Sequence, residues 1–308
     1  MVTRLYSHPI FAEHETPSGH PERADRIRAV ERILEDEPFI ALDRVTAPKG
    51  DEATVLYAHP EEYLEKIRAS IPEEGIVKID SDTYVSPKSF EAALTAVGAA
   101  NAGVDDVFSG KADNVFVASR PPGHHAEKTT AMGFCLFNNA AIAARYAQKK
   151  HGAERVAIID WDVHHGNGTQ DIFWEDPSVL YCSTHQMPLY PGTGAKSEAG
   201  VGNIVNAPLS PQTGSDIFRE AFNSRVLPAI NDFSPDLIII SAGFDAHHLD
   251  PLAEINLTEE DFDWATGKLM DRAARHSGNR LLSLLEGGYD LQGLSFSVAA
   301  HVKRLMKG

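Results

Sequence analysis

The chain has 308 residues, 43% of them hydrophobic, and its 44 acidic against 28 basic residues give a net charge of −16. This charge argues against tight binding to nucleic acid, which requires a basic surface. No apolar run approaches the roughly 18 residues of a membrane-spanning helix, so we expect no contact with a membrane. The two cysteines, Cys135 and Cys182, form no CxxC pair. We therefore expect no disulfide and a cytoplasmic location.

The predicted elements alternate between helices and strands. In chain order they are helices at 22–34 and 87–108, a strand at 114–119, a helix at 138–150, strands at 155–160 and 178–183, a helix at 215–232, a strand at 237–241, a helix at 257–276 and a strand at 280–285. Thr258 and Asp261 resemble a capping box at the start of the last helix. Runs such as VAIID and LIIIS are β-branched with little alternation, which is typical of parallel strands covered on both faces.

This order predicts the α/β class, with a three-layer fold in which helices flank a mostly parallel central sheet. No repeat or Ser/Gly-rich linker divides the sequence, so we expect a single domain over residues 1–308.

Unusual polar clusters follow four of the predicted strands. They are RPPGHHA after 114–119, WDVHHGNG after 155–160, AGFDAHH after 237–241 and EGGYD after 280–285. In open α/β sheets, ligands bind beyond the carboxyl ends of the strands. The four clusters are therefore predicted to converge on one cleft.

Asp160, Asp162 and His164 are spaced by two residues. If the strand stays extended through them, all three side chains point the same way. A carboxylate and an imidazole at a strand end suit zinc, and one more ligand would leave a position open for water. A helix cap beside a surface histidine is the alternative for an isolated DxH, but acidic residues rarely lie unpartnered at a buried strand end.

Asp245, at the end of SAGFD, is the best candidate for the third metal ligand. The preceding Gly243 permits close approach of the backbone. An ordinary loop aspartate is the alternative. His247 and His248 are rival ligands, although they lie further into the loop.

His124 and His125 follow a stiff Arg-Pro-Pro-Gly turn. Imidazoles titrate near neutral pH, so a positioned pair can take a proton from water and later protonate a leaving amine. Asp160 could orient one of them. Tandem histidines are otherwise ordinary exposed polar residues.

Tyr289 follows two glycines that allow a sharp bend, so its hydroxyl could donate to a developing oxyanion. Taken alone, the motif favours the alternative, a turn with a packed tyrosine. Phe134 and Tyr190 lie in loops that contain glycine or proline, where they could wall an apolar channel or fill the core.

The strings RPPGHHA, GFCLFNN, DWDVHHGNGTQ, PGTG, SAGFDAH and LEGGYDL, together with HPERADRI near the N-terminus, resemble the zinc-dependent histone deacetylase family. The similarity is to the class II-like branch of bacterial-type amidohydrolases, and it covers almost the whole chain. It implies the arginase/deacetylase fold and a zinc ion held by Asp162, His164 and Asp245.

The resemblance also implies roles for other residues. His125 would be the general base of the His124–His125 pair, with Asp160 beside them, and Tyr289 would stabilise the transition state. Gly133, Phe134, Tyr190 and Gly288 would bind substrate, and Arg23 would be the arginine of an internal channel. A structural potassium ion is implied near Asp160, Asp162, His164, Ser183 and Thr184, and a second monovalent cation near main-chain oxygens of Phe173, Asp176, Val179 and Asn203. Asn167 departs from the class I pattern, which has an aspartate there.

The expected function is zinc-dependent removal of an acetyl or other short acyl group from an acylated amine by metal-activated water. Nε-acetyl-lysine is the first candidate substrate, and an acetylpolyamine or another small amide is the alternative, since Asp80, Asp82 and Glu127 suit either. An inactive acyl-binding protein and a dimanganese ureohydrolase are rival hypotheses. The former should have lost a ligand, a histidine or the tyrosine, and the latter needs more ligands. The oligomeric state stays open.

Overall fold

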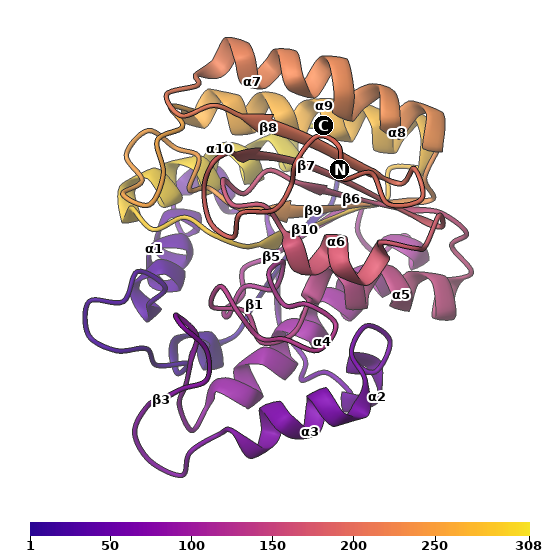
Figure 1. The fold of residues 1–308 in the computed structure, drawn as a ribbon. Coiled ribbons are helices and arrows are strands. Elements are labelled where there is room, and N and C mark those ends of the chain that lie inside the picture. The colour runs from indigo at the N-terminus through magenta and orange to yellow at the C-terminus, as the bar shows by residue number, and fades with distance from the viewer.

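An eight-stranded sheet runs through the centre of the computed structural model, which describes residues 1–308 (Figure 1). Its strands are β1 (Thr3–Ser7), β2 (Asp43–Thr46), β5 (Asn114–Val117), β6 (Val156–Asp160), β7 (Val179–Gln186), β8 (Ile204–Leu209), β9 (Leu237–Ala242) and β10 (Leu281–Leu285). Their order is β2-β1-β5-β10-β9-β6-β7-β8, and every neighbouring pair is parallel. A separate hairpin pairs β3 (Val77–Lys78) with β4 (Tyr84–Val85).

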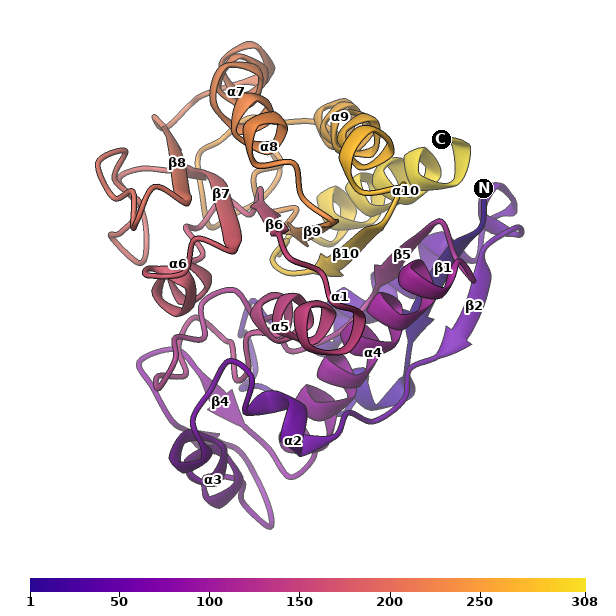
Figure 2. The same cartoon turned by 90° about the vertical axis from the view of Figure 1, so that its right-hand side faces the viewer.

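Helices cover both faces of the sheet. They are α1 (Ala24–Leu34), α2 (Glu52–Val55), α3 (Glu61–Ala69), α4 (Ser89–Ser109), α5 (Asn139–His151), α6 (Asn167–Phe173), α7 (Ser215–Ala221), α8 (Leu227–Phe233), α9 (Glu259–His276) and α10 (Leu291–Lys307). Figure 2 shows α4 and α5 on one face and α7 to α10 on the other. All residues of β5, β6, β7, β9 and β10 are buried between these layers. The predicted three-layer α/β fold is confirmed.

The five predicted strands correspond to β5, β6, β7, β9 and β10, whereas β1, β2 and β8 were not predicted. β2 and β8 form the two edges of the sheet. β2 has four residues and alternates between half-buried and exposed side chains, and β8 includes Asn206 and Pro208. Edge strands bury less apolar surface than central ones, so their sequence signal is weak.

The predicted helix at 215–232 is interrupted. A π-helical turn at Phe222–Val226 separates α7 from α8, and Pro228, in the first turn of α8, lacks the amide hydrogen that a continuous helix would use. The capping box at α9 is confirmed, because Thr258 and Asp261 exchange side-chain-to-backbone hydrogen bonds. None of the helices combines the length and the apolar character needed to cross a membrane.

The four polar clusters follow strands that are adjacent in the sheet. β5, β10, β9 and β6 are consecutive neighbours, and all four are parallel. Their carboxyl ends therefore lie at one edge, and the turns that follow them meet there. This topology positions the candidate site.

Candidate active site

The turn after β6 folds around its own carboxylates. β6 ends at Asp160, so the expectation of an extended strand through Asp162 and His164 is wrong. Instead, the Asp162 N–H donates to Asp160 Oδ1 at 3.1 Å, and the His164 N–H donates to Asp162 Oδ1 at 2.9 Å. Short side chains that bond backbone two residues on favour turns over strands. The Val163 N–H donates to Asp245 Oδ1 at 2.8 Å, which ties this turn to the one after β9.

Three side chains converge where these turns meet. Ligand atoms of Asp162, His164 and Asp245 all lie within 4.8 Å of one another, and all three residues are buried. His164 Nδ1 is 3.1 Å from Asp162 Oδ1 and 3.1 Å from Asp245 Oδ2. The rival ligands point elsewhere: His247 Nε2 lies 3.7 Å from Glu259 Oε1, and His248 Nδ1 contacts the Leu257 carbonyl oxygen.

The donor set fits a divalent cation. Burial, together with the nearby Asp162 carboxylate, raises the pKa of Asp245 to about 7, because a second buried negative charge beside Asp162 is unfavourable. Glycines leave the space around them: a Cβ at Gly243 would lie 2.1 Å from Asp162 Oδ2, and one at Gly287 would lie 2.2 Å from Asp245 Oδ2. Two carboxylates and one imidazole are ligands that zinc accepts in open sites.

The two histidines of the RPPGHHA turn lie beside this triad. Their ring centroids are 4.0 Å apart. The backbone N–H groups of Gly123 and His124 both donate to Glu286 Oε2, at 2.7 and 3.1 Å. Nδ1 of His124 lies 3.0 Å from Asp160 Oδ2, whereas Nδ1 of His125 lies 2.8 Å from Asn167 Oδ1. The turn after β5 is thus fixed by the turns after β10 and β6.

Because their partners differ, the two imidazoles have different pKa values. Burial alone would lower the pKa of His124, but Asp162 and Asp160 outweigh it and raise that pKa well above the usual value. Burial lowers the pKa of His125 well below its usual value, and the neighbouring His124 and His164 lower it further. Two imidazoles with pKa values shifted in opposite directions lie side by side, which is an arrangement that suits acid–base chemistry.

A cleft of about 230 Å³ leads to His125 and His164. Its Tyr289 ring packs edge-on against Phe134 at 5.8 Å and lies 4.9 Å from the guanidinium of Arg26. The lining residues are Asp82, His125, Gly133, Phe134, His164, Leu189, Tyr190, Leu252 and Tyr289. The cleft is therefore lined mainly by apolar and aromatic side chains, together with the polar side chains of Asp82, His125 and His164.

Two glycines shape this cleft. Gly133 has a φ of +56°, and a Cβ there would lie 2.4 Å from His125 Cδ2. Gly288 has a φ of +120°, which lets the backbone turn directly before Tyr289. The Tyr289 N–H then donates to Asp250 Oδ2 at 2.6 Å.

The arginine near the cleft is Arg26 and not Arg23, so that expectation is wrong. Arg23 is exposed and pairs with Asp25 at 3.6 Å. Arg26 is fully buried and donates to the Gly288 and Glu286 carbonyl oxygens at 2.5 and 2.6 Å. The sequence held a signal for the burial of Arg26, because this arginine shares the buried face of α1 with Ile27 and Val30.

Comparisons with known proteins agree with this geometry. A family model described as histone deacetylase domain matches residues 20–305. The chain belongs to the histone deacetylase domain family. A "Histone deacetylase-like amidohydrolase" of Pseudomonas aeruginosa is 40% identical over 294 residues, covering 94% of this chain and 77% of the relative. A "Probable deacetylase" of Archaeoglobus fulgidus is 40% identical over 303 residues, covering 95% and 83%.

Solved structures support the same assignment. The crystal structure of the HDA15 HD domain has a TM-score of 0.93 and 39% identity, and the match covers 99% of this chain and 89% of that one. The predicted resemblance is therefore confirmed. The expected class of enzyme, a deacetylase or amidohydrolase, is confirmed at the level of the family.

The residues that the resemblance implies for each of two cation positions lie near one another in the structure. Asp160 and Ser183 are direct neighbours across β6 and β7, and Thr184 follows in β7. Ser183 Oγ is 2.8 Å from His185 Nδ1. At the second expected position, Asn203 Nδ2 donates to three carbonyl oxygens at 2.8 to 2.9 Å, those of Phe173, Asp176 and Val179. A side-chain amide thus occupies the convergence point of these oxygens.

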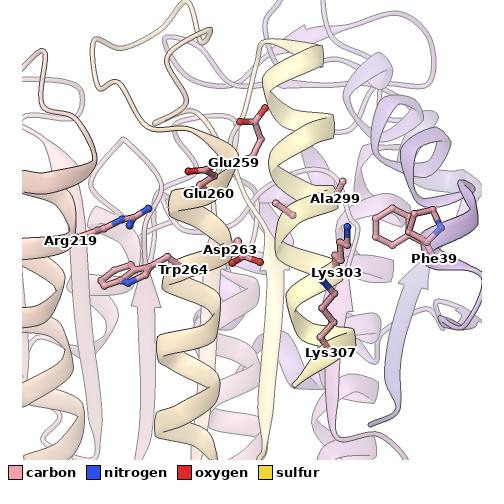
Figure 3. Close-up of a pocket in the computed structure, with 11 residues that line it drawn as sticks. Phe39, Arg219, Glu259, Glu260, Asp263, Trp264, Ala299, Lys303 and Lys307 are labelled. Atoms are coloured by element: carbon pink, nitrogen blue, oxygen red, sulfur yellow. The ribbon is translucent and has the colours of Figure 1, made fainter.

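A larger cavity than this cleft lies away from the triad. It measures about 620 Å³ and lies between α9 and α10 on the outer helical face (Figure 3). Its lining includes Phe39, Trp264 and Lys303 but no residue that lines the cleft beside the triad. The two cavities are therefore separate features of the molecule.

Proposed function

We propose that the chain is a zinc-dependent hydrolase that removes acetyl or other short acyl groups from acylated amines, with Nε-acetyl-lysine as its main substrate. The observation that carries this proposal is the buried group of Asp162, His164 and Asp245 beside His124 and His125. A metal site, an acid–base pair and a narrow cleft meet at one point.

In this proposal Asp162, His164 and Asp245 hold the zinc ion. When bound, the ion supplies Lewis-acid activation of the acyl carbonyl and of a water molecule. The neutral His125 accepts a proton from that water through Nε2, because its Nδ1 faces Asn167 Oδ1. The charged His124, paired with Asp160, stabilises negative charge that develops beside it.

The remaining steps use groups of the cleft. The Tyr289 hydroxyl donates to the carbonyl oxygen as that oxygen gains charge. The water oxygen forms a bond to the acyl carbon, the carbon–nitrogen bond breaks, and a protonated imidazole gives its proton to the amine nitrogen. No serine or cysteine nucleophile is required, and the Cys135 thiol donates to the Gly133 carbonyl oxygen at 3.2 Å.

The cleft walls favour a long, uncharged acyl-amine chain. Phe134, Tyr190, Leu189 and Leu252 supply apolar surface to the lining of the cleft. Asp82 is the acidic residue of the lining, and its Oδ1 already accepts from the Gly133 N–H at 3.1 Å. One carboxylate that is already engaged in a hydrogen bond is better suited to bind the amide backbone around a modified lysine than to bind the several cationic amines of a polyamine.

The substrate is tested by comparing kcat/KM for an acetyl-lysine peptide with kcat/KM for acetylputrescine and acetylspermidine. We expect the peptide to be preferred by about tenfold or more, which corresponds to roughly 1.4 kcal/mol of transition-state binding. A preference for either acetylpolyamine would transfer the proposal to the small-amide alternative.

The rival hypotheses lose support for specific reasons. A dimanganese site needs a second cluster of ligands, but one group of three is present, and His165 Nδ1 contacts Thr193 Oγ1 instead. An inactive acyl-binding protein would not need two adjacent histidines whose pKa values are shifted in opposite directions. We further propose a potassium ion near Asp160, Ser183 and Thr184, and a cytoplasmic location in keeping with two free cysteines.

A further inference from the structure

His124 and His125 differ in the kind of group that faces Nδ1. Asp160 presents a carboxylate to His124, and a carboxylate can only accept, so it fixes a hydrogen on that Nδ1. Asn167 presents an amide to His125. An amide can accept through its oxygen or donate through its nitrogen, so Asn167 alone does not fix the tautomer of His125.

The other end of the Asn167 amide touches only acceptors. Its Nδ2 donates to Glu127 Oε1 at 2.8 Å and lies 3.3 Å from Met132 Sδ. Turning the amide by half a rotation would place Oδ1 against both the carboxylate and the sulfur, with no hydrogen between them. Asn167 is 5% exposed, so water offers little compensation. Glu127 thus disfavours the orientation of the Asn167 amide in which Oδ1 faces Glu127 and Nδ2 faces His125.

Backbone packing prevents Asn167 from moving away. A Cβ at Gly168 would lie 2.2 Å from the Ala126 carbonyl oxygen, so α6 begins in contact with the segment that carries both histidines. The Thr169 N–H donates to the His124 carbonyl oxygen at 3.2 Å. Rotation of the amide group is therefore the freedom that the Asn167 side chain retains.

We propose that Glu127 is a positioning residue: it holds the Asn167 amide oxygen toward His125 and thereby keeps the hydrogen of His125 on Nδ1. In that tautomer Nε2 has a free lone pair and accepts a proton from water. The other tautomer carries its hydrogen on Nε2 and cannot. The catalytic consequence rests on the proposed function, in which His125 is the general base.

Two substitutions at Glu127 test this by changing hydrogen-bond polarity. Glu127→Gln satisfies either amide orientation and should lower kcat modestly. Glu127→Lys only donates, so it should reverse the amide and lower kcat by about 10²-fold, the lower end of the cost of a missing general base. KM for a neutral substrate, such as acetyl-lysine blocked at both ends, should change little, and so should zinc content and melting temperature.

A further substitution, at Asn167, should restore the tautomer of His125 in the presence of the lysine at position 127. Asn167→Asp places an acceptor-only group against His125, and that carboxylate can also accept from a lysine at position 127. The double variant Glu127→Lys/Asn167→Asp should therefore recover most of the lost kcat. A role of Glu127 limited to local packing predicts no such rescue.

Nitrogen NMR of histidine-labelled protein reads the tautomer directly, with the His125 signal assigned by its loss in His125→Ala. We expect hydrogen on Nδ1 in the parent and the double variant, and on Nε2 in Glu127→Lys. An unchanged tautomer in Glu127→Lys would overturn the inference, as would a rise in KM with kcat preserved, which would make Glu127 a substrate-binding carboxylate. A parent that shows these tautomers but hydrolyses no acylamine would instead refute the proposed function alone.

Discussion

Two adjacent histidines have pKa values shifted in opposite directions because their surroundings differ. His124 lies among the carboxylates of Asp160 and Asp162, whereas His125 contacts a neutral amide and lies near two other imidazoles. Identical side chains one residue apart thereby differ in how strongly they hold a proton. The sequence shows the pair, but the partners come from β6 and α6, some 36 and 42 residues further along the chain.

At the same scale, Tyr289→Phe tests the oxyanion donor. The ring is held by Phe134 and Arg26, so the substitution keeps packing and removes only the hydroxyl. We expect kcat to fall by about 10²–10³-fold with little change in KM, because the hydrogen bond strengthens only as charge develops. The measurement is steady-state kinetics at matched zinc content. A loss below about threefold would show that Tyr289 only packs in the turn.

Removing the proposed base gives a second prediction for single residues. His125→Ala should lower kcat by about 10²–10⁴-fold while zinc remains bound, since His125 is not among the three candidate ligands. Metal analysis and kinetics on the same preparation provide the check. Near-normal turnover with full metal content would assign the base elsewhere.

Secondary-structure elements explain why the chemistry lies at strand ends. β5, β10, β9 and β6 are neighbours, so their following turns meet although they are far apart in sequence. Close approach at that edge depends on glycine. Gly243, in the turn after β9, lies against the Asp162 carboxylate after β6.

Gly243→Ala should therefore weaken zinc binding by about 10–100-fold, a typical effect of disturbing the groups that orient a ligand. The Cβ would meet Asp162 Oδ2 at 2.1 Å. Gly214→Ala is a matched control, because the nearest atom to its Cβ is 3.8 Å away. Competition with a chelator measures the affinity. Equal affinities for the two variants would mean that Asp162 is not positioned by this contact.

Sequence patterns predicted the central elements better than the connections between them. Apolar runs located β5, β6, β7, β9 and β10, because these strands are buried on both faces. Short edge strands such as β2 left little signal. The contacts of Glu286 with backbone N–H groups of the β5 turn could not be inferred, since they depend on which strands become neighbours.

At the scale of the whole molecule, buried neutral histidines couple stability to pH. His59 Nδ1 lies 3.2 Å from the Lys128 carbonyl oxygen, and its Nε2 accepts from the Asn138 N–H at 2.9 Å, so a second ring hydrogen has no place. His301 lies between Thr266 and Ser283. Burial lowers the pKa of His59 to about 4 and that of His301 to about 3.

The unfolded chain takes up these protons near pH 6.5, whereas the folded chain does not until the lower pKa is reached. The stabilising effect is therefore fully present above pH 6.5 and is lost as pH falls, by about 1.4 kcal/mol per pH unit for each histidine. Urea unfolding between pH 6 and pH 5 should show a shallower pH dependence for His301→Gln than for the parent. Equal slopes would contradict the neutral assignment of His301.

The central claim is that one metal ion at Asp162, His164 and Asp245 is required for amide hydrolysis. The most direct test strips the protein with a chelator and follows hydrolysis of an acetyl-lysine peptide as zinc is added back. We expect the rate to rise in proportion to zinc, to level off at about one equivalent per chain, and to stay near zero in Asp245→Ala. Full activity in the stripped protein, or normal zinc-restored activity in Asp245→Ala, would contradict the claim.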